Sequence, residues 1–423
     1  MLMEESSNMN KRRVVITGAG ICSSLGDTWP EILTTLKGLQ NCVVRMDDWD
    51  RYGVGMNTRL AAPYTKDLRK YDRKKTRSMG RVSRLALQAT DDALRMAGLV
   101  SADGVVAEEL HNGRTGISYG SCMGSMDANM EFCHMLEHDD CSKMNATTYV
   151  RAMPQTAASN LSVYFQIRGR IITTNTACTS GSQSIGYSYE QIAYGFQDMM
   201  VAGGAEELSA ADSDIFDTLF AASVKNDAPK TSPSPFSKER DGLVIGEGAG
   251  TLILEEYEHA KARGAKIYAE IIGFGTNQDG NHITTPNPDT MGKAIALAIE
   301  DAGISSDQIG YINAHGTATG HGDVAETTAT EAVFKRAVPI SSTKSYTGHT
   351  LGACGTIEAW VAINMMKEGW FHPTLNLTEA NLDPECGKLD YIMGSGREIQ
   401  TDIVMSNNFA FGGVNTSLIF KRV

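Results

Sequence analysis

Short runs of β-branched and other apolar residues alternate along the chain with longer segments in which apolar residues recur every three or four positions. The runs predict strands at 14–17, 116–120, 171–174, 199–202, 267–275, 309–313 and 403–405. The longer segments predict helices at 85–96, 255–266, 292–302 and 352–367, and a helix after residue 178. Strands that alternate with helices in this way indicate an α/β fold.

The order of the predicted elements suggests that the chain consists of two similar halves. The charged helical segment 255–266 is interpreted as the seam between them, and beyond it the order of strands and helices repeats in outline. We therefore predict an N-terminal half at 12–265, a C-terminal half at 266–423, and a disordered polar leader at 1–11. Residue identity between the halves is weak, so this duplication is inferred from the order of elements.

A glycine-rich segment follows the first predicted strand and raises the question of a nucleotide site. The strand at 14–17 opens onto Gly18-Ala19-Gly20, which is interpreted as a turn. A dinucleotide-binding fingerprint requires a third glycine where this chain has Ser23. The sequence therefore does not favour dinucleotide binding.

Composition and charge exclude several classes of function. The net charge is −12, which argues against a general nucleic-acid binder. No apolar run reaches the roughly 18 residues of a membrane span, and residues 1–10 lack the pattern of a signal peptide. The eight cysteines are scattered without a CxxC pair, which is typical of reduced thiols in a cytoplasmic protein.

Cys178 stands out because it ends a predicted strand and precedes a predicted helix. A helix N-terminus favours the thiolate, and the free backbone N–H groups there can stabilise an oxyanion. The neighbours Ala177, Thr179, Ser180 and Gly181 are small and leave room for a substrate. A buried structural cysteine is the commoner fate of a free thiol, so Cys178 alone leaves both interpretations open.

Two histidines also lie where strands give way to loops rich in Gly, Thr and Ser. His315 follows the strand at 309–313, and His349 lies in a Gly-flanked loop before a helix. Loops at strand ends are where α/β sheets place their chemistry. Metal binding is a rival interpretation, but neither histidine has a partner three or four residues away and no carboxylate cluster accompanies them. Lys344 supplies a nearby positive charge, and Glu358 falls on the following helix.

Four motifs together resemble the elongating β-ketoacyl-ACP synthases of the thiolase-fold superfamily. They are TNTACTSG at 174–181, NAHGTATGHGD at 313–323, KSYTGHTLGACG at 344–355 and NNFAFGGVN at 407–415. The segments VVITGAG at 14–20 and DGLVIGEGAG at 241–250 extend the resemblance from about residue 12 to the C-terminus. The resemblance implies a thiolase-like fold with α-β-α-β-α layers.

The resemblance also implies a reaction, the decarboxylative condensation of an acyl group with malonyl-ACP. Cys178 matches the family's acyl-accepting nucleophile, and His315 and His349 match the pair that promotes decarboxylation. Lys344 matches the lysine that orders the site, and Phe411 matches a gate whose amide completes an oxyanion hole with that of Cys178. No cofactor is implied.

Substrate contacts and an ion are implied for further positions. Thr317 and Thr319 match hydroxyls that hold the pantetheine arm, Met123 matches the mouth of the acyl pocket, and Phe409 is expected to contact substrate. A structural Na⁺ or K⁺ found in some relatives implies a site near Asn313, Glu358, Ser406 and Asn407.

Some positions depart from the family pattern, and rival functions remain. Thr179, Ala410 and Cys122 stand where Ala, Gly and Gly are usual, which leaves acyl-chain preference and gate motion open. The pattern suits a fatty-acid enzyme or a ketosynthase of polyene or polyketide assembly. The rivals are a CoA-dependent thiolase-type acyltransferase and a non-catalytic chain-length partner, which typically lacks the cysteine.

The resemblance implies an acyl carrier protein as partner and a homodimer as assembly. Segment 66–84 has nine basic residues against two acidic ones, in a chain that is acidic overall. Solvated helix faces often carry such runs, but this one is strongly one-sided. We predict that a subset contacts the carrier, namely Lys70, Arg73, Lys74 and Arg77.

Overall fold

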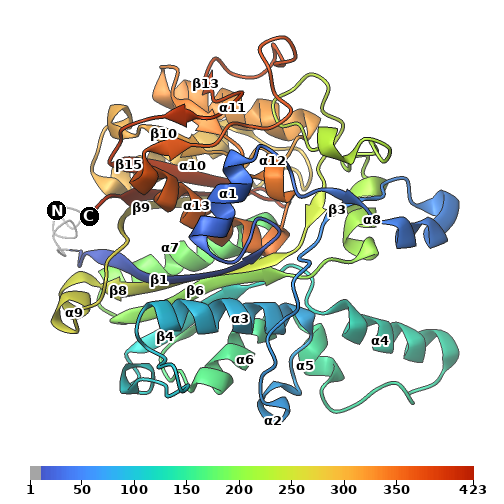
Figure 1. Cartoon of the computed structure of the whole chain (residues 1–423), viewed down its shortest axis with the longest axis vertical. Coiled ribbons are helices and arrows are strands. Elements are labelled where there is room, and N and C mark those ends of the chain that lie inside the picture. Colours follow the sequence, from blue (N-terminus) through green and yellow to red (C-terminus); the bar gives the residue numbers. More distant parts are fainter. Residues whose placement is uncertain (1–10) are drawn as a thin grey trace.

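The computed structural model describes residues 11–423, and its centre is an eleven-stranded sheet made of two halves (Figure 1). The first half has the order β1 (Val14–Ser23), β8 (Gly248–Glu256), β6 (Met199–Glu206), β4 (Thr115–Gly120) and β5 (Ile171–Thr173). The second has the order β9 (Ala269–Gln278), β16 (Val414–Lys421), β15 (Ile403–Phe409), β10 (Tyr311–Asn313), β11 (Pro339–Ser341) and β13 (Asp390–Tyr391). Three residue pairs between β1 and β9 join the halves.

The two halves repeat the same strand directions. In each, the first two pairings are antiparallel and the next two are parallel. The duplication and the α/β class predicted from the sequence are therefore confirmed. The predicted division between residues 265 and 266 falls between α9 (Tyr257–Ala262) and β9. The predicted leader, apart from Lys11, lies outside the described residues.

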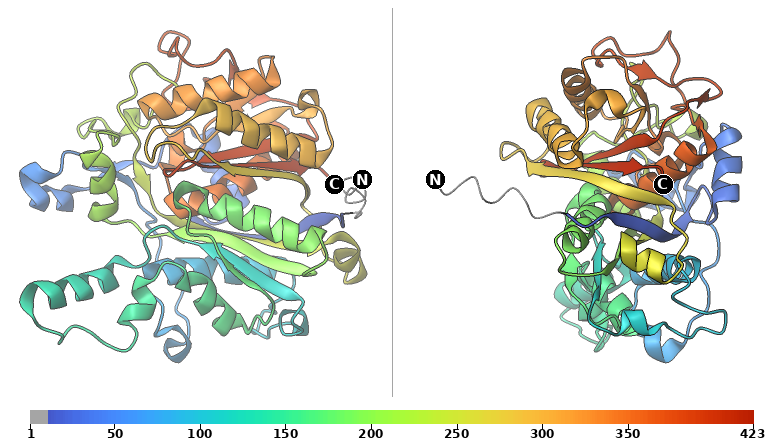
Figure 2. Two further views of the ribbon diagram at one scale, coloured as in Figure 1. Left: turned by 180° about the vertical axis from the view of Figure 1, so that it is seen from behind. Right: turned by 90° about the vertical axis from the view of Figure 1, so that its left-hand side faces the viewer.

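Helices form three layers around the two half-sheets, as the views in Figures 1 and 2 show. Between the half-sheets lie α7 (Ser180–Ala193) and α13 (Cys354–Glu368), and α13 is buried over most of its length. Outside them, α3 (Arg81–Met96) and α6 (Thr156–Phe165) cover the first half, and α10 (Pro288–Ala302) and α11 (Gly320–Phe334) cover the second. This is the α-β-α-β-α layering expected from the sequence.

Shorter helices and strands lie in the connections between these elements. The helices are α1 (Trp29–Lys37), α2 (Arg73–Thr76), α4 (Met126–His138), α5 (Thr148–Ala152), α8 (Ala210–Thr218) and α12 (Lys344–Thr347). The strands are β2 (Val44–Arg45), β3 (Leu60–Ala62), β7 (Ile245–Gly246), β12 (Trp370–Phe371) and β14 (Arg397–Glu398). The 3₁₀ helices are η1 (Asp47–Gly55), η2 (Glu108–Leu110), η3 (Ala177–Thr179), η4 (Pro229–Thr231), η5 (Ser306–Gln308) and η6 (Leu351–Ala353).

Matching glycines let the outer helices approach the sheet closely in both halves. A Cβ added at Gly20 would lie 2.0 Å from the carbonyl oxygen of Ala89 on α3. In the second half, a Cβ at Gly275 would lie 2.1 Å from the carbonyl oxygen of Ala294 on α10. The prediction of a turn at 18–20 was therefore wrong, because these glycines lie inside β1 and make room for a helix backbone.

Other element boundaries also differ from the sequence prediction. Strand β15 continues through Asn407 and Asn408 to Phe409, so only 410–413 remains as a turn before β16. The start of segment 255–266 belongs to β8, which leaves α9 as a short helix. Pairing with neighbouring strands extends both segments beyond what their own residue types predict.

The close approach at Gly20 predicts a stability effect. We expect Gly20→Ala to lower the free energy of unfolding by about 2 kcal/mol or more, because overpacking forces the backbone of α3 away from β1. Gly55→Ala is the control, since a Cβ there meets no atom within 4 Å. Urea unfolding of both variants measures the difference, and equal stabilities would contradict close packing at Gly20.

Candidate active site

A strained turn presents Cys178 at the start of the first central helix. The thiol lies on η3, immediately before α7, and the residue is 5% exposed. Ala177, directly before it, has a φ of +49°, a conformation that costs energy in any residue with a Cβ. The hydroxyl of Ser180 stabilises the turn by accepting from the N–H of Thr176 and donating to the carbonyl of Ala177. Strain of this kind is typical of functional sites.

The loop after β10 carries His315 and is anchored by a carboxylate on α11. Glu326 accepts hydrogen bonds from the backbone N–H groups of His315 and Gly316, both at 2.7 Å. Its neighbour Asp323 accepts from the N–H of Ala318. The sequence analysis missed both acids, although they follow the histidine motif closely on the next helix. They fix the backbone that carries the imidazole.

Three chain segments bring one cysteine and two histidines together in the interior. Nε2 of His349 lies 2.9 Å from Sγ of Cys178. The ring centroids of His315 and His349 are 5.2 Å apart, and the ring planes are nearly perpendicular, at 86°. All three side chains are buried. The structure therefore assembles the three residues that the sequence singled out separately.

Hydrogen bonds to Nδ1 fix the same tautomer in both rings. The N–H of Leu351 donates to Nδ1 of His349 at 3.2 Å, and Nδ2 of Asn408 donates to Nδ1 of His315 at 3.4 Å. The Asn408 amide cannot be reversed without cost, because its Nδ2 also donates to the Glu358 carboxylate at 2.8 Å. A neutral imidazole that accepts at Nδ1 carries its proton on Nε2. Both rings are therefore hydrogen-bond donors at Nε2.

A buried ion pair sets the electrostatics of the site. Nζ of Lys344 lies 2.5 Å from Oε1 of Glu358, and both side chains are almost fully buried. Burial alone lowers the pKa of Lys344, but its acidic neighbours Cys354, Glu358 and Cys178 raise it above its usual value. The pKa values of His315 and His349 fall well below 6.5 because of burial and the Lys344 charge. Both rings are therefore neutral at physiological pH.

The thiol of Cys178 differs from the sequence expectation. Burial raises its pKa to about 11, while Lys344 and the backbone N–H groups of Phe411 and Cys178 act in the opposite direction. The expected lowering of the thiol pKa was therefore wrong, because loss of hydration outweighs these favourable charges and dipoles. The two N–H groups beside the sulfur remain available to stabilise an oxyanion on a carbonyl group that becomes bonded to it.

A cavity of about 540 Å³ leads from the surface to the cysteine and both histidines. Thr317, Thr319, Phe409 and Phe411 line it, and the two threonine hydroxyls lie 2.9 Å apart. Phe411 stacks on Phe216 of α8, with centroids 5.3 Å apart and planes at 27°.

Met123 is not among the residues that line this cavity. Its N–H and that of Cys122 donate to the buried carboxylate of Glu206, which also accepts from the N–H of Gly352. Sequence reasoning did not identify Glu206, which joins the Met123 loop to the segment after His349. The role of Met123 at an acyl pocket stays a prediction.

The residues proposed for a monovalent cation offer few free oxygens. Side-chain oxygens of Asn313 and Asn407 already accept from the hydroxyls of Thr343 and Ser417. The two carboxylate oxygens of Glu358 accept from Lys344 and Asn408, while the buried Ser406 hydroxyl and Nδ2 of Asn407 lack a partner among the described residues. A structural cation at these residues stays a prediction.

Donor atoms of Cys178, His315 and His349 lie within 4.8 Å of one another, a grouping that could hold a metal ion. They come from separate segments, so the spacing argument of the sequence analysis did not address them. The positive charge of Lys344, which influences all three groups, opposes a cation there.

The predicted carrier-docking residues lie together on the surface, on and beside α2 at the bottom of Figure 1. All four predicted residues are exposed, and none of them forms an ion pair with another described residue. They are Lys70, Arg73, Lys74 and Arg77. In contrast, Lys66, Arg69 and Arg81 from the same basic run pair with acids of neighbouring elements. The four free cations form the α2 patch.

Among residues 11–423, no helix combines the length and apolar character needed to cross a bilayer.

Known proteins match the chain over nearly its whole length. The family model of the β-ketoacyl synthase N-terminal domain matches residues 11–260, and that of the C-terminal domain matches 268–378. The 3-oxoacyl-[acyl-carrier-protein] synthase 2 of Vibrio cholerae is 39% identical over 98% of this chain and all of its own. The enzyme of the same name from Staphylococcus aureus is 36% identical over 97% of this chain and 98% of its own.

Solved structures agree with these relatives. A β-ketoacyl synthase from Burkholderia phymatum is 54% identical, with a TM-score of 0.94 over 97% of this chain and all of its own. The ishigamide ketosynthase/chain length factor is 30% identical, with a TM-score of 0.87 over 98% of this chain and all of its own. With the four motifs in one site and both family models matched, the chain belongs to the β-ketoacyl synthase family of condensing enzymes.

Proposed function

We propose that this protein condenses an acyl group, held on Cys178, with malonyl-ACP to give 3-oxoacyl-ACP and CO2. The observation that carries the proposal is the pair of neutral imidazoles beside the thiol, each with its proton on Nε2. One cysteine suffices to hold an acyl group, but two adjacent neutral donors are suited to a developing enolate oxygen. This geometry supports an elongating synthase.

The first step is transfer of the acyl group to the thiol. Sγ of Cys178 attacks the thioester carbonyl, whose oxygen faces the N–H groups of Cys178 and Phe411. Each such donor is worth about 3 kcal/mol in related acyl transfers. The bond from carbon to the carrier sulfur breaks, and the proton lost from Cys178 ends on the departing carrier thiol. Because the thiol pKa is about 11, this proton leaves only as the new bond forms.

The second step consumes malonyl-ACP. When CO2 leaves, the electrons of the broken carbon–carbon bond stay with the thioester and form an enolate. The enolate oxygen accepts hydrogen bonds from Nε2–H of His315 and His349. The enolate carbon attacks the acyl carbonyl on Cys178, the carbon–sulfur bond breaks, and the sulfur regains a proton from solvent. Covalent storage of the acyl group thus divides one reaction into two steps.

The rival functions fit the site less well. A chain-length partner typically lacks the cysteine, whereas here Cys178, both histidines and Lys344 form one connected site. A thiolase-type acyltransferase uses a second cysteine near the C-terminus as a base. The corresponding segment here is Gly412-Gly413-Val414-Asn415 and contains none.

Acyl carrier protein is the proposed partner, and the cytoplasm is the proposed location. The V. cholerae and S. aureus relatives are named as acyl-carrier-protein synthases. A ketosynthase of 29% identity and TM-score 0.85 was solved in complex with its acyl carrier protein. The unpaired cations of the α2 patch support docking of an acidic protein on a chain whose net charge is −12.

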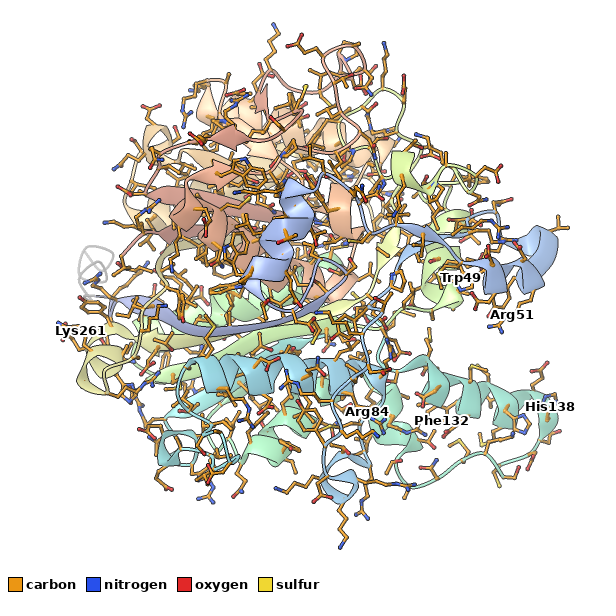
Figure 3. All side chains as sticks on the ribbon, viewed as in Figure 1. Trp49, Arg51, Arg84, Phe132, His138 and Lys261 are labelled. Carbon is orange, nitrogen blue, oxygen red and sulfur yellow. The ribbon has the colours of Figure 1, made fainter. Side chains whose placement is uncertain are left out.

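A homodimer is the proposed assembly, and the arm formed by α4 and α5 supports it. The arm projects from the body of the molecule, with His138 near its far end and Phe132 partway along α4 (Figure 3). Met130, Leu136 and Tyr149 are 64–76% exposed on it. Exposed apolar side chains on a projecting element are typical of a protein interface, and a two-fold dimer is the commonest assembly of soluble proteins.

The variant Cys178→Ser tests the role of the thiol separately from that of the imidazoles. We expect condensation to fall roughly a thousandfold or more, because a key nucleophile is lost, while malonyl-ACP decarboxylation continues. Since the histidine pKa values lie well below 6.5, the decarboxylation rate should show no inflection between about pH 6 and 7. Steady-state CO2 release across pH measures this. Normal condensation, or an inflection near 6.5, would contradict the assignment.

The α2 patch predicts a carrier-specific effect. We expect Lys74→Glu combined with Arg77→Glu to raise the KM for acyl-ACP several-fold and to flatten its salt dependence, because exposed charges act by steering. The rate at which a carrier-free acyl thioester acylates Cys178, measured without malonyl-ACP, should stay constant. Lys335→Glu with Lys388→Glu makes the same charge change near the C-terminal end of α11, on the opposite side of the molecule. If both pairs of substitutions have equal effects, net charge and not the patch is responsible.

The arm predicts the oligomeric state. Light scattering should give about twice the chain mass of 45.6 kDa. Leu136→Asp should shift the protein toward the monomer, because the substitution places a charge in an apolar contact. Val163→Asp changes another exposed apolar residue, on α6 and outside the arm, and should leave the dimer intact. A wild-type monomer at micromolar concentration would refute the proposal.

A further inference from the structure

The side on which the active-site cavity opens carries exposed apolar side chains. Among the residues that line the cavity, Phe220 is 92% exposed, Ile283 is 71% exposed and Leu219 is 46% exposed. Phe220 and Leu219 follow α8, and Ile283 lies in the loop after β9. We call Phe220 and Ile283 the apolar rim. Two large side chains so fully in water at the opening of a catalytic cavity require an explanation.

The backbone at Phe220 adds a second reason to look for a function. Helix α8 ends in a Schellman motif, in which the N–H of Ala221 donates to the carbonyl of Phe216 at 2.8 Å and that of Phe220 donates to the carbonyl of Asp217 at 2.9 Å. Phe220 occupies the left-handed position of this motif, with a φ of +54°. Glycine is the usual residue there, because a side chain strains the backbone. The chain therefore keeps an exposed ring at a position where it costs stability.

The cavity itself is lined by little free positive charge. Arg240 is the one lysine or arginine among the described residues that line the cavity. Its side chain is only 6% exposed, and it pairs with Asp383 at 2.5 Å. A protein that covers the cavity opening thus meets apolar groups there, while free cations lie on the α2 patch.

Both rim residues belong to segments that contact the turn of Phe411. Phe216, one turn before Phe220 on α8, stacks on the Phe411 ring. On the other side, the carbonyl of Ile283 accepts from the N–H of Gly412 at 2.8 Å. The rim is therefore held directly at the passage to Cys178, which any substrate tethered to a carrier must use.

We infer that Phe220, together with Ile283, is an apolar docking contact for the acyl carrier protein, and that it meets exposed apolar side chains beside the carrier's acyl-bearing arm. This inference rests on the proposed function, because only a tethered substrate brings a protein to the cavity opening. A ketosynthase relative was solved in complex with its acyl carrier protein, which shows that such a partner is available to this family. The contact adds a component of binding that does not depend on salt.

Phe220→Gly is a sharp test, because glycine suits the left-handed position and the variant should fold at least as stably as the wild type. The substrates are octanoyl acyl carrier protein and octanoyl-N-acetylcysteamine, which has no carrier. Acylation of Cys178 is measured without malonyl-ACP, because malonyl-ACP would bring a carrier into both assays. We expect the KM for the carrier substrate to rise about tenfold, as for truncation of an aromatic anchor. The KM for the small thioester should change less than about twofold, and Phe220→Tyr should restore most of the carrier affinity.

Leu39→Gly is the matched control. Leu39 is also apolar, 38% exposed and left-handed, with a φ of +54°, but it does not line the cavity. It should leave both KM values unchanged. The rise caused by Phe220→Gly should also persist in high salt, where the effect of reversing charges on the α2 patch is screened.

Three results would overturn the inference. If Phe220→Gly leaves the KM for the carrier substrate unchanged, Phe220 does not contact the carrier. An equal rise for both substrates shows that the ring shapes the cavity itself, and a change in oligomeric state shows that it contacts a second copy of the chain. Failure of the proposed function is distinct from all three, because the wild type would then not condense either substrate.

Discussion

The buried ion pair of Lys344 and Glu358 is the interaction on which the site depends. An ammonium group in a protein interior is tolerated only when it is paired and hydrogen-bonded, and Glu358 on α13 supplies that partner. The same carboxylate fixes the orientation of Asn408, which in turn fixes the tautomer of His315. Burial and, after it, the Lys344 charge lower the pKa of both imidazoles and keep them neutral. One buried pair therefore contributes to the neutral state of both imidazoles and, through Asn408, sets the hydrogen-bond direction of His315.

The duplicated architecture explains why these residues can meet in a dry interior. Cys178 comes from the first half and both histidines come from the second, and the layer formed by α7 and α13 lies between the half-sheets. Glycines at equivalent places in β1 and β9 let α3 and α10 pack closely on the outer faces. Backbone strain is present at the site, because Ala177, Ala318 and Leu351 all have positive φ beside its catalytic segments. The surrounding framework must be rigid to maintain such conformations.

Much of this could be predicted from the sequence, because motifs record residue type and position in the chain. Cys178, His315, His349 and Lys344 each lie in a small-residue loop at an element boundary, and four motifs in order identify a family. The role of Glu326 could not be predicted in this way, because its hydrogen bonds to the loop of His315 depend on how α11 packs. Gly18 and Gly20 were taken for a turn because a sequence does not distinguish a glycine that bends the chain from one that admits a helix. The direction of the Cys178 pKa shift also depends on burial, which local sequence does not determine.

The central claim is that two neutral histidines promote decarboxylation while the cysteine holds the acyl group. The most direct test measures CO2 release from malonyl-ACP and acyl-enzyme formation side by side in the wild type, His315→Ala and His349→Ala. Removal of one donor to a developing oxyanion typically costs about 100-fold to 1,000-fold. We predict a loss of that size in CO2 release for each variant, with acylation of Cys178 reduced far less. CO2 release at the wild-type rate in both variants would show that the histidines are structural and would contradict this account.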